Sequence, residues 1–147
     1  MLAPGSKMPD FILEDQHGNL FDSVAPRNNH LVIFFYPKDY TPGCTAQVCG
    51  FRDEYEEFQS VGADLIGISG DSTKSHQRFS KTFGLPFPLL SDPQRKVHRL
   101  FGVGKQLFGL VSKRVTFVVD TNNTILMAHE DPRPGSHIRK ALKLLLD

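Results

Sequence analysis

The feature that most constrains this chain is an uninterrupted apolar run, LVIFFY, at residues 31–36. The run is rich in β-branched and aromatic side chains, and Pro37 ends it. A strand with one solvated face alternates apolar and polar residues, whereas a run without polar positions is typical of a strand buried on both faces. We therefore expect this segment at the centre of a sheet, with other parts of the chain covering both of its sides.

An amphipathic helix is predicted after this strand. Apolar residues recur at spacings of three, four and three, with charged residues between them, at Val48, Phe51, Tyr55 and Phe58. This period places the four side chains on one face of a single helix, which then has a face for the core. We expect Gly62 to close that helix.

A second strand and a second helix of the same kind come next. Residues 64–69 form another short apolar run, and Asp71 and Ser72 then supply a cap for a helix that runs to Phe83 and stops at Gly84. The order strand, helix, strand, helix predicts a parallel βαβ core.

The C-terminal part predicts a hairpin and a last helix. Residues 115–120 and 124–130 flank a Thr-Asn-Asn turn whose asparagines tolerate positive φ. The last helix has an apolar stripe at Ile138, Ala141, Leu142 and Leu145. We expect an α/β fold with a central mixed β-sheet flanked by helices, in one domain that spans residues 1–147.

Composition narrows the classes of partner. The formal net charge is +1 and 22% of residues are charged, so the chain lacks the basic surplus of a protein that binds nucleic acid or an anionic membrane. Its longest apolar run is far too short to span a bilayer, and residues 1–10 contain no signal-like apolar stretch. We expect a soluble chain, either unexported or already processed, whose partners are neutral molecules or proteins.

Cys44 is the first candidate for chemistry. It follows Thr41-Pro42-Gly43, where a strand has ended and a helix is starting, so its sulfur is expected near unpaired backbone N–H groups and the positive end of the helix dipole. Such a position stabilises a thiolate, which is the nucleophilic form of cysteine. The alternative is a small buried hydrophobe, the commoner role of a lone cysteine.

Cys49 lies five residues later on the same predicted helix. Five helical steps put the two Cα atoms about 8–9 Å apart on different faces, whereas a disulfide needs them within about 7 Å. A bond between these cysteines therefore requires the first turns of the helix to unwind. Because Val48 and Phe51 are apolar, a structural core thiol remains an alternative for Cys49.

Two other uses of cysteine fit less well. A zinc site needs paired ligands at close spacing. Here four residues lie between the two cysteines, and the histidines are neither near them nor paired with one another. A cysteine protease would need a histidine brought in by the fold, and nothing local selects one. We therefore expect no metal, and expect the six histidines to be surface or partly buried structural residues: His17, His30, His76, His98, His129 and His137.

The segment 36–49, YPKDYTPGCTAQVC, resembles the active site of peroxiredoxins, whose signature is proline, three residues, threonine, two residues and cysteine. A second cysteine five residues after the first, with glutamine between them, is typical of the subfamily called peroxiredoxin Q or bacterioferritin comigratory protein. The similarity continues through FRD at 51–53, LIGISGD at 65–71, LLSD at 89–92 and RVTFVVD at 114–120. Residues 105–110, KQLFGL, look more like the plant and cyanobacterial members than the enterobacterial ones.

The resemblance implies a thioredoxin-like (peroxiredoxin) fold and roles for individual residues. Cys44 would be the peroxidatic nucleophile and Arg114 the cation beside it, with Lys113 a less favoured substitute. Thr41 would hydrogen-bond the sulfur and the peroxide, and Cys49 would resolve the oxidised product through a Cys44–Cys49 disulfide. The remaining site residues would shield the site or contact substrate, and they are Pro37, Pro42, Gly43 and Gln47.

The implied activity is reduction of hydrogen peroxide and alkyl hydroperoxides through a cysteine sulfenic acid, with thioredoxin or possibly a glutaredoxin as reductant and no cofactor. A monomer in a bacterial or cyanobacterial cytoplasm is expected, or in a plastid if the chain is a processed plant protein. Two alternatives remain: a non-enzymatic thiol redox sensor, which would use the same residues, and a general disulfide oxidoreductase. The second would usually carry cysteines two residues apart, which this chain lacks.

Overall fold

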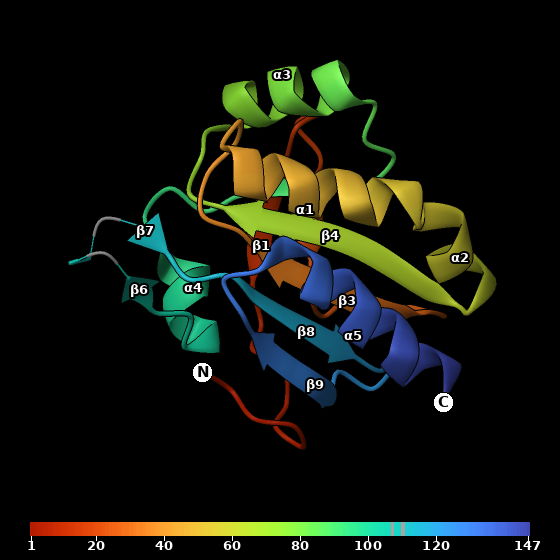
Figure 1. Cartoon of the computed structure of the whole chain (residues 1–147). Coiled ribbons are helices and arrows are strands. Elements are labelled where there is room, and N and C mark those ends of the chain that lie inside the picture. The colour runs from red at the N-terminus through yellow and green to blue at the C-terminus, as the bar shows by residue number, and fades with distance from the viewer. Residues whose placement is uncertain (107, 110) are drawn as a thin grey trace.

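The computed structural model describes residues 1–106, 108–109 and 111–147. Seven of the described strands form one sheet in the order β2-β1-β5-β4-β3-β8-β9, and β6 pairs with β7 separately (Figure 1). In chain order the elements are β1 (Ile12–Asp15), β2 (Leu20–Asp22), β3 (His30–Phe35), α1 (Pro42–Asp53), α2 (Tyr55–Ser60), β4 (Ala63–Ser69), α3 (Thr73–Phe83), β5 (Leu89–Ser91), α4 (Lys96–Phe101), β6 (Lys105–Gln106), β7 (Val111–Ser112), β8 (Val115–Val119), β9 (Ile125–Glu130) and α5 (Pro134–Leu146).

Strand β3 lies at the centre of the sheet, as its sequence predicted. It pairs in parallel with β4 and antiparallel with β8, so that Val32 lies beside Leu65 on one side and Val118 on the other. All residues of β3 after His30 are buried. The sheet is therefore mixed, and the α/β expectation is confirmed.

The two faces of the sheet are covered by different elements. Side chains alternate along a strand, and Val32, Phe34 and Tyr36 join the core cluster that also contains residues of α1, α3 and α5. Ile33 and Phe35 point to the other face, into a cluster with residues of α4 and of the N-terminal segment. Figure 1 shows α1 and α5 side by side on the first face, which brings the start of α1 close to the turn before α5.

Most predicted elements are present, but the first helix differs. The single helix expected over residues 48–58 is divided at Glu54, where φ is −100° and ψ is 11°, into α1 and α2. The predicted ends of α3 are confirmed: the Ser72 hydroxyl accepts from the Ser75 amide at 3.1 Å, and Gly84 is left-handed at φ 60°. Asn123 in the predicted hairpin turn also has positive φ, 65°.

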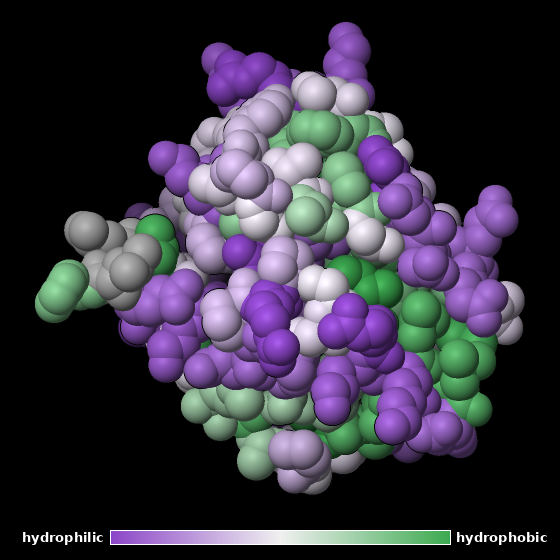
Figure 2. Space-filling view, viewed as in Figure 1, coloured by the Kyte–Doolittle hydropathy of each residue, from purple (hydrophilic) through white to green (hydrophobic). Residues whose placement is uncertain are grey.

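The structure adds short elements that the sequence patterns did not predict, namely β1, β2, β5, α4 and the β6–β7 pair. The resemblance of residues 105–110 to plant and cyanobacterial proteins falls partly on residues 107 and 110, which lie outside the described residues. Figure 2 shows polar side chains over most of the visible face and an apolar area beside the C-terminal half of α5, where Leu146 is exposed. Within the described ranges, no helix is long and apolar enough to cross a membrane.

Candidate active site

The start of α1 holds Cys44. Thr41 is the N-cap residue, Pro42 occupies the first helical turn, and the Thr45 amide donates to the Thr41 carbonyl at 2.8 Å. The amides of Gly43 and Cys44 precede this first helical bond, so they have no partner within the helix. Cys44 is 1% exposed. The predicted position of this sulfur at a helix N-terminus is confirmed.

Arg114, the residue directly before β8, contacts the same sulfur. Its Nη1 donates to Cys44 Sγ at 3.5 Å and to Gln47 Oε1 at 2.5 Å, and its Nε donates to the Pro132 carbonyl at 3.3 Å. The side chain is almost buried, and a guanidinium keeps its charge there. Seventy residues separate Arg114 from Cys44 in the chain, and only the family resemblance had placed them together.

Gly43 and Gln47 shape the space around this guanidinium. A Cβ atom on Gly43 would lie 3.1 Å from Arg114 Nη2, closer than side chains normally approach. Gln47 is fully buried, and its Nε2 has no hydrogen-bond partner among the described residues. Lys113, the less favoured candidate, instead pairs with Glu130 at 3.5 Å. The Arg114 guanidinium thus contacts the Gln47 side-chain amide on one side and lies close to the backbone of Gly43 on the other.

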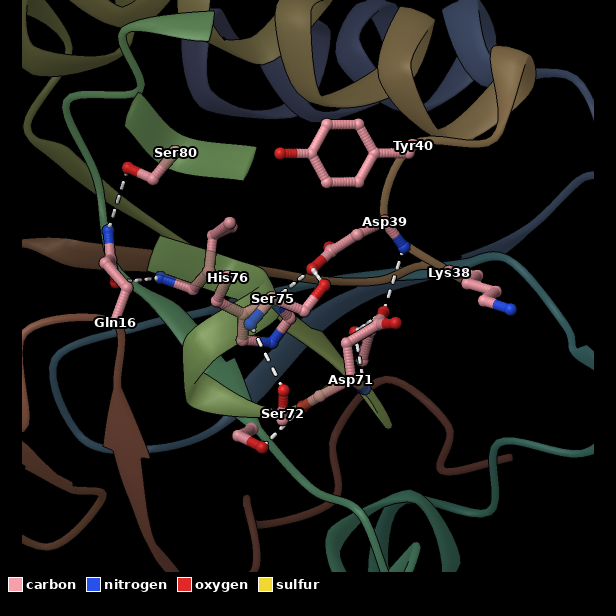
Figure 3. A network of polar contacts seen from close by, with 12 residues as sticks. Gln16, Lys38, Asp39, Tyr40, Asp71, Ser72, Ser75, His76 and Ser80 are labelled. Atoms are coloured by element: carbon pink, nitrogen blue, oxygen red, sulfur yellow. Dashed lines mark hydrogen bonds and ion pairs between the residues drawn. The ribbon is translucent and has the colours of Figure 1, made fainter. Parts of the chain in front are cut away.

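The segment before Cys44 is fixed by a buried polar network (Figure 3). The Asp39 amide donates to Asp71 Oδ2 at 2.9 Å, and the Asp39 carboxylate accepts from Tyr36 Oη at 2.7 Å and from Ser75 Oγ at 2.8 Å. Burial and the Asp39 charge raise the pKa of Tyr36 well above its usual value, so Tyr36 stays a donor. Tyr40, the next residue, has φ 68°, a conformation that a bulky side chain rarely adopts without such constraint.

The network also positions Thr41. The Thr41 hydroxyl donates to the Lys38 carbonyl at 2.9 Å. A hydroxyl has one proton, so in this conformation the Thr41 oxygen can act toward any other group only as an acceptor. The expected bond from Thr41 to the sulfur is therefore not made in this structure. Pro37 is half-buried and Pro42 is exposed.

His76 completes the network and was not anticipated. Its Nε2 lies 3.0 Å from the Leu90 carbonyl and its Nδ1 lies 2.8 Å from Asp39 Oδ2. The ligand-type atoms of Asp39, Asp71 and His76 lie within 4.8 Å of one another, but the hydrogen bonds above occupy them. The expectation that the histidines are surface or partly buried is wrong for His76, His98 and His137, which are all 0% exposed. Their polar partners come mostly from distant segments, so no local pattern marked them.

Cys49 lies on α1, half-buried, and both cysteines are free thiols. Burial raises the pKa of Cys49, while the charge of Arg52 lowers it and that of Asp53 raises it. Because the helix is intact from Pro42 to Asp53, the two cysteines keep the helical separation that the sequence predicted, which is too long for a disulfide.

Known proteins resemble this chain over most of its length. The sequence profile of the AhpC/TSA family matches residues 4–128. The chain is 45% identical over 145 residues to "Peroxiredoxin Q, chloroplastic" from Sedum lineare. The aligned residues cover 98% of this chain and 78% of that protein. Among solved structures, Peroxidoxin BcpB from Mycobacterium tuberculosis superposes with a TM-score of 0.92 at 38% identity, covering 99% of this chain and 97% of that one.

A second solved structure, Xanthomonas campestris Peroxiredoxin Q, gives a TM-score of 0.86 at 33% identity over 92% of this chain and 89% of that one. These neighbours confirm the thioredoxin-like (peroxiredoxin) fold expected from the sequence. Family match, sequence identity and fold agree across nearly the whole chain. The chain therefore belongs to the AhpC/TSA family, as a peroxidase of the peroxiredoxin Q group.

Proposed function

We propose that this chain reduces hydrogen peroxide and alkyl hydroperoxides with Cys44 as the peroxidatic cysteine and Cys49 as the resolving cysteine. The observation that carries the proposal is the contact between Arg114 Nη1 and Cys44 Sγ, at 3.5 Å, at the N-terminus of α1. A fixed positive charge and a helix N-terminus act on the same sulfur, and both favour the thiolate.

In the first step the Cys44 thiolate attacks the terminal oxygen of the peroxide. The S–O bond forms as the O–O bond breaks, and the released oxygen leaves as an alkoxide or hydroxide that takes up a proton, giving a sulfenic acid and an alcohol or water. Donors near the leaving oxygen lower this barrier. We assign that role to Arg114, whose charge stays fixed, and assign the Thr41 oxygen to accept from the peroxide O–H.

Packing around the site supports the other assignments. Gln47 holds Arg114 through Oε1, and Gly43 leaves room for the guanidinium. Pro37 lies in the loop after β3 and Pro42 lies in the first turn of α1, and we assign both to limit the access of water to Cys44. No metal, haem or flavin takes part in these steps.

In the second step the Cys49 thiol attacks the Cys44 sulfenic acid, forming the disulfide and releasing water. This step requires the first turns of α1 to unwind, because an intact helix keeps the two sulfurs apart. A dithiol of the thioredoxin or glutaredoxin type then reduces the disulfide by thiol exchange and is itself oxidised to a disulfide. The raised pKa of Cys49 keeps it a thiol until this stage.

We infer that residues 1–147 act as one domain and as a monomer that resolves within one chain, and that neither nucleic acid nor membrane is a partner. Curated plant relatives carry the word chloroplastic in their names. We place this chain in a bacterial or cyanobacterial cytoplasm, or in a plastid if it is a processed plant protein.

The test is stopped-flow oxidation of the reduced chain by hydrogen peroxide, with Cys44→Ser and Cys49→Ser variants. Wild type should react far faster than free cysteine and turn over with thioredoxin. Cys49→Ser should react once and stop, and Cys44→Ser should not react.

Each alternative has its own signature in the same experiment. A redox sensor would oxidise once without sustained turnover, and a general disulfide oxidoreductase would exchange thiols but react slowly with peroxide. A wild-type rate no faster than free cysteine would refute the peroxidase proposal. Sustained turnover by Cys49→Ser would refute the role of Cys49.

A further inference from the structure

The turn between β9 and α5 supplies one of the three contacts that hold Arg114. The Pro132 carbonyl accepts from Arg114 Nε at 3.3 Å. The same turn is tied to the backbone of Arg114, because the Asp131 amide donates to the Arg114 carbonyl at 3.3 Å. The Pro132 carbonyl lies in the peptide between Pro132 and Arg133, and the fixed φ of proline ties the position of that carbonyl to the preceding peptide, between Asp131 and Pro132.

That peptide is held by His137, on the first turns of α5. His137 Nε2 lies 2.7 Å from the Asp131 carbonyl, and His137 Nδ1 lies 2.8 Å from Thr116 Oγ1. A carbonyl only accepts, so Nε2 carries the proton, and Nδ1 then accepts from the Thr116 hydroxyl. His137 and Thr116 are both 0% exposed. This pair of bonds joins α5, the turn and β8 directly.

Thr116 lies in β8, and Arg114 directly precedes that strand. The two side chains lie on the same side of the sheet, because Arg114 contacts Cys44 of α1, Thr116 contacts His137 of α5, and both helices pack on that face. Hydrogen bonds thus connect Thr116 to His137 and His137 to Asp131. The next residue, Pro132, accepts from Arg114, so both ends of this chain of contacts lie beside Arg114. The other side of the turn is clamped separately, since Arg133 makes hydrogen bonds to the Asp131 carboxylate at 2.8–3.2 Å.

We propose that His137 is a positioning residue for the peroxidase site: by accepting from Thr116 and donating to the Asp131 carbonyl, it fixes the Pro132 carbonyl that orients the Arg114 guanidinium at Cys44 and the peroxide. The inference rests on the proposed function, in which Arg114 serves the thiolate and the leaving oxygen. His137 touches neither the sulfur nor the substrate and acts through Arg114.

The charge state of His137 fits this role. Burial, followed by the positive charges of His129 and Arg114, lowers the pKa of His137 to about 4, whereas its bond to the Asp131 carbonyl and the Asp131 charge act in the opposite direction. The imidazole is thus neutral at neutral pH and keeps its acceptor for Thr116. A second cation beside Arg114 is avoided.

The experiment compares His137→Phe, which keeps the ring volume but loses both hydrogen bonds, with His137→Gln, whose amide can still donate to the Asp131 carbonyl. Each is made in the wild-type and the Arg114→Ala background. Two quantities are measured: the rate of Cys44 oxidation by hydrogen peroxide, and the pH midpoint of Cys44 alkylation by iodoacetamide. His98→Phe is the matched control, since His98 is equally buried but packs in the core cluster on the opposite face of the sheet, against Phe35.

In the wild-type background, His137→Phe should lower the peroxide rate about tenfold and raise the alkylation midpoint, because a shift of under 1 Å in a reacting group has effects of this order. His137→Gln should restore most of the rate. With Arg114→Ala present, His137→Phe should change the rate less than about twofold, since coupled residues are not additive. His98→Phe should leave both quantities near wild type.

Equal fold losses in the two backgrounds would overturn the proposal, because they would make His137 a general structural residue. Folded His137→Phe with wild-type rate and midpoint would also overturn it. If the wild type itself fails to react with peroxide, the proposed function fails, whereas the alkylation midpoint still reports whether His137 acts on Arg114.

Discussion

Replacing Gly43 with alanine tests whether Arg114 must lie where it does. The added Cβ would be 3.1 Å from Arg114 Nη2, so the guanidinium must move by a few tenths of an ångström. The backbone of Gly43 is helical and its φ is not in the left-handed region, so alanine itself fits the conformation. The perturbation therefore falls on the arginine, and it weakens the contacts of Arg114 with Cys44 and Gln47.

The expected size follows from two opposing effects. Misplacement of a catalytic group by about 1 Å costs about a hundredfold in rate, so a displacement of a few tenths should cost about tenfold, or about 1.4 kcal/mol in barrier. Alanine is the better helix former by up to about 1 kcal/mol. Gly43→Ala should thus react more slowly with peroxide while its unfolding free energy stays level or rises.

The assay is stopped-flow oxidation by hydrogen peroxide together with urea denaturation. Gly135→Ala is the matched control, because α5 begins with Pro134-Gly135 just as α1 begins with Pro42-Gly43. A Cβ on Gly135 would meet only the end of the exposed Arg139 side chain, at 3.0 Å. A wild-type oxidation rate for Gly43→Ala, or the same loss in Gly135→Ala, would refute the reasoning.

Three further outcomes are expected. Gly67→Ala should lower the unfolding free energy measured in urea by about 1–3 kcal/mol, since its Cβ would lie 2.8 Å from the buried Phe34 ring; an unchanged midpoint would contradict this. Gln47→Leu should slow peroxide oxidation by freeing Arg114 and should change thermal stability little, because the loss of the Oε1 acceptor for Arg114 is offset by removal of a buried Nε2 that has no partner among the described residues. The folded chain disfavours protonated His137, whose pKa of about 4 lies below the unfolded value of 6.5, so stability should be full above pH 6.5 and fall by about 3 kcal/mol as pH drops toward 4; urea titrations of His137→Phe should lack most of that slope.

Local patterns were sufficient for the core of the fold. The apolar run that became β3, the caps of α3 and the asparagine turn between β8 and β9 are each specified within a few residues, and all are confirmed. The short strands β1, β2 and β5 contain three or four residues each. A segment of that length has too few positions to show a period, and tertiary pairing decides its conformation.

In the candidate site too, local sequence predicted some residues, whereas others depend on contacts between distant segments. Cys44 could be placed from sequence because a loop that enters a helix is a local feature. Arg114 could not, because its contact with Cys44 depends on how β8 lies beside β3. The buried histidines were missed for a related reason: imidazole is polar, and only partners such as Thr116, 21 residues away, or Asp39, 37 residues away, make its burial acceptable.

The break at Glu54 bears on how fast the enzyme could cycle. Because α2 is a separate helix with Phe58 fully buried, unwinding that starts at Cys44 can stop at the break and leave α2 on the sheet. Only about a dozen residues then refold in each turnover, and helices of this size re-form within about 1 μs. A reductant at micromolar concentration meets its target only about 0.1–10 times per second at ordinary protein association rates. Re-formation of α1 is therefore far faster than the supply of reducing equivalents at that concentration.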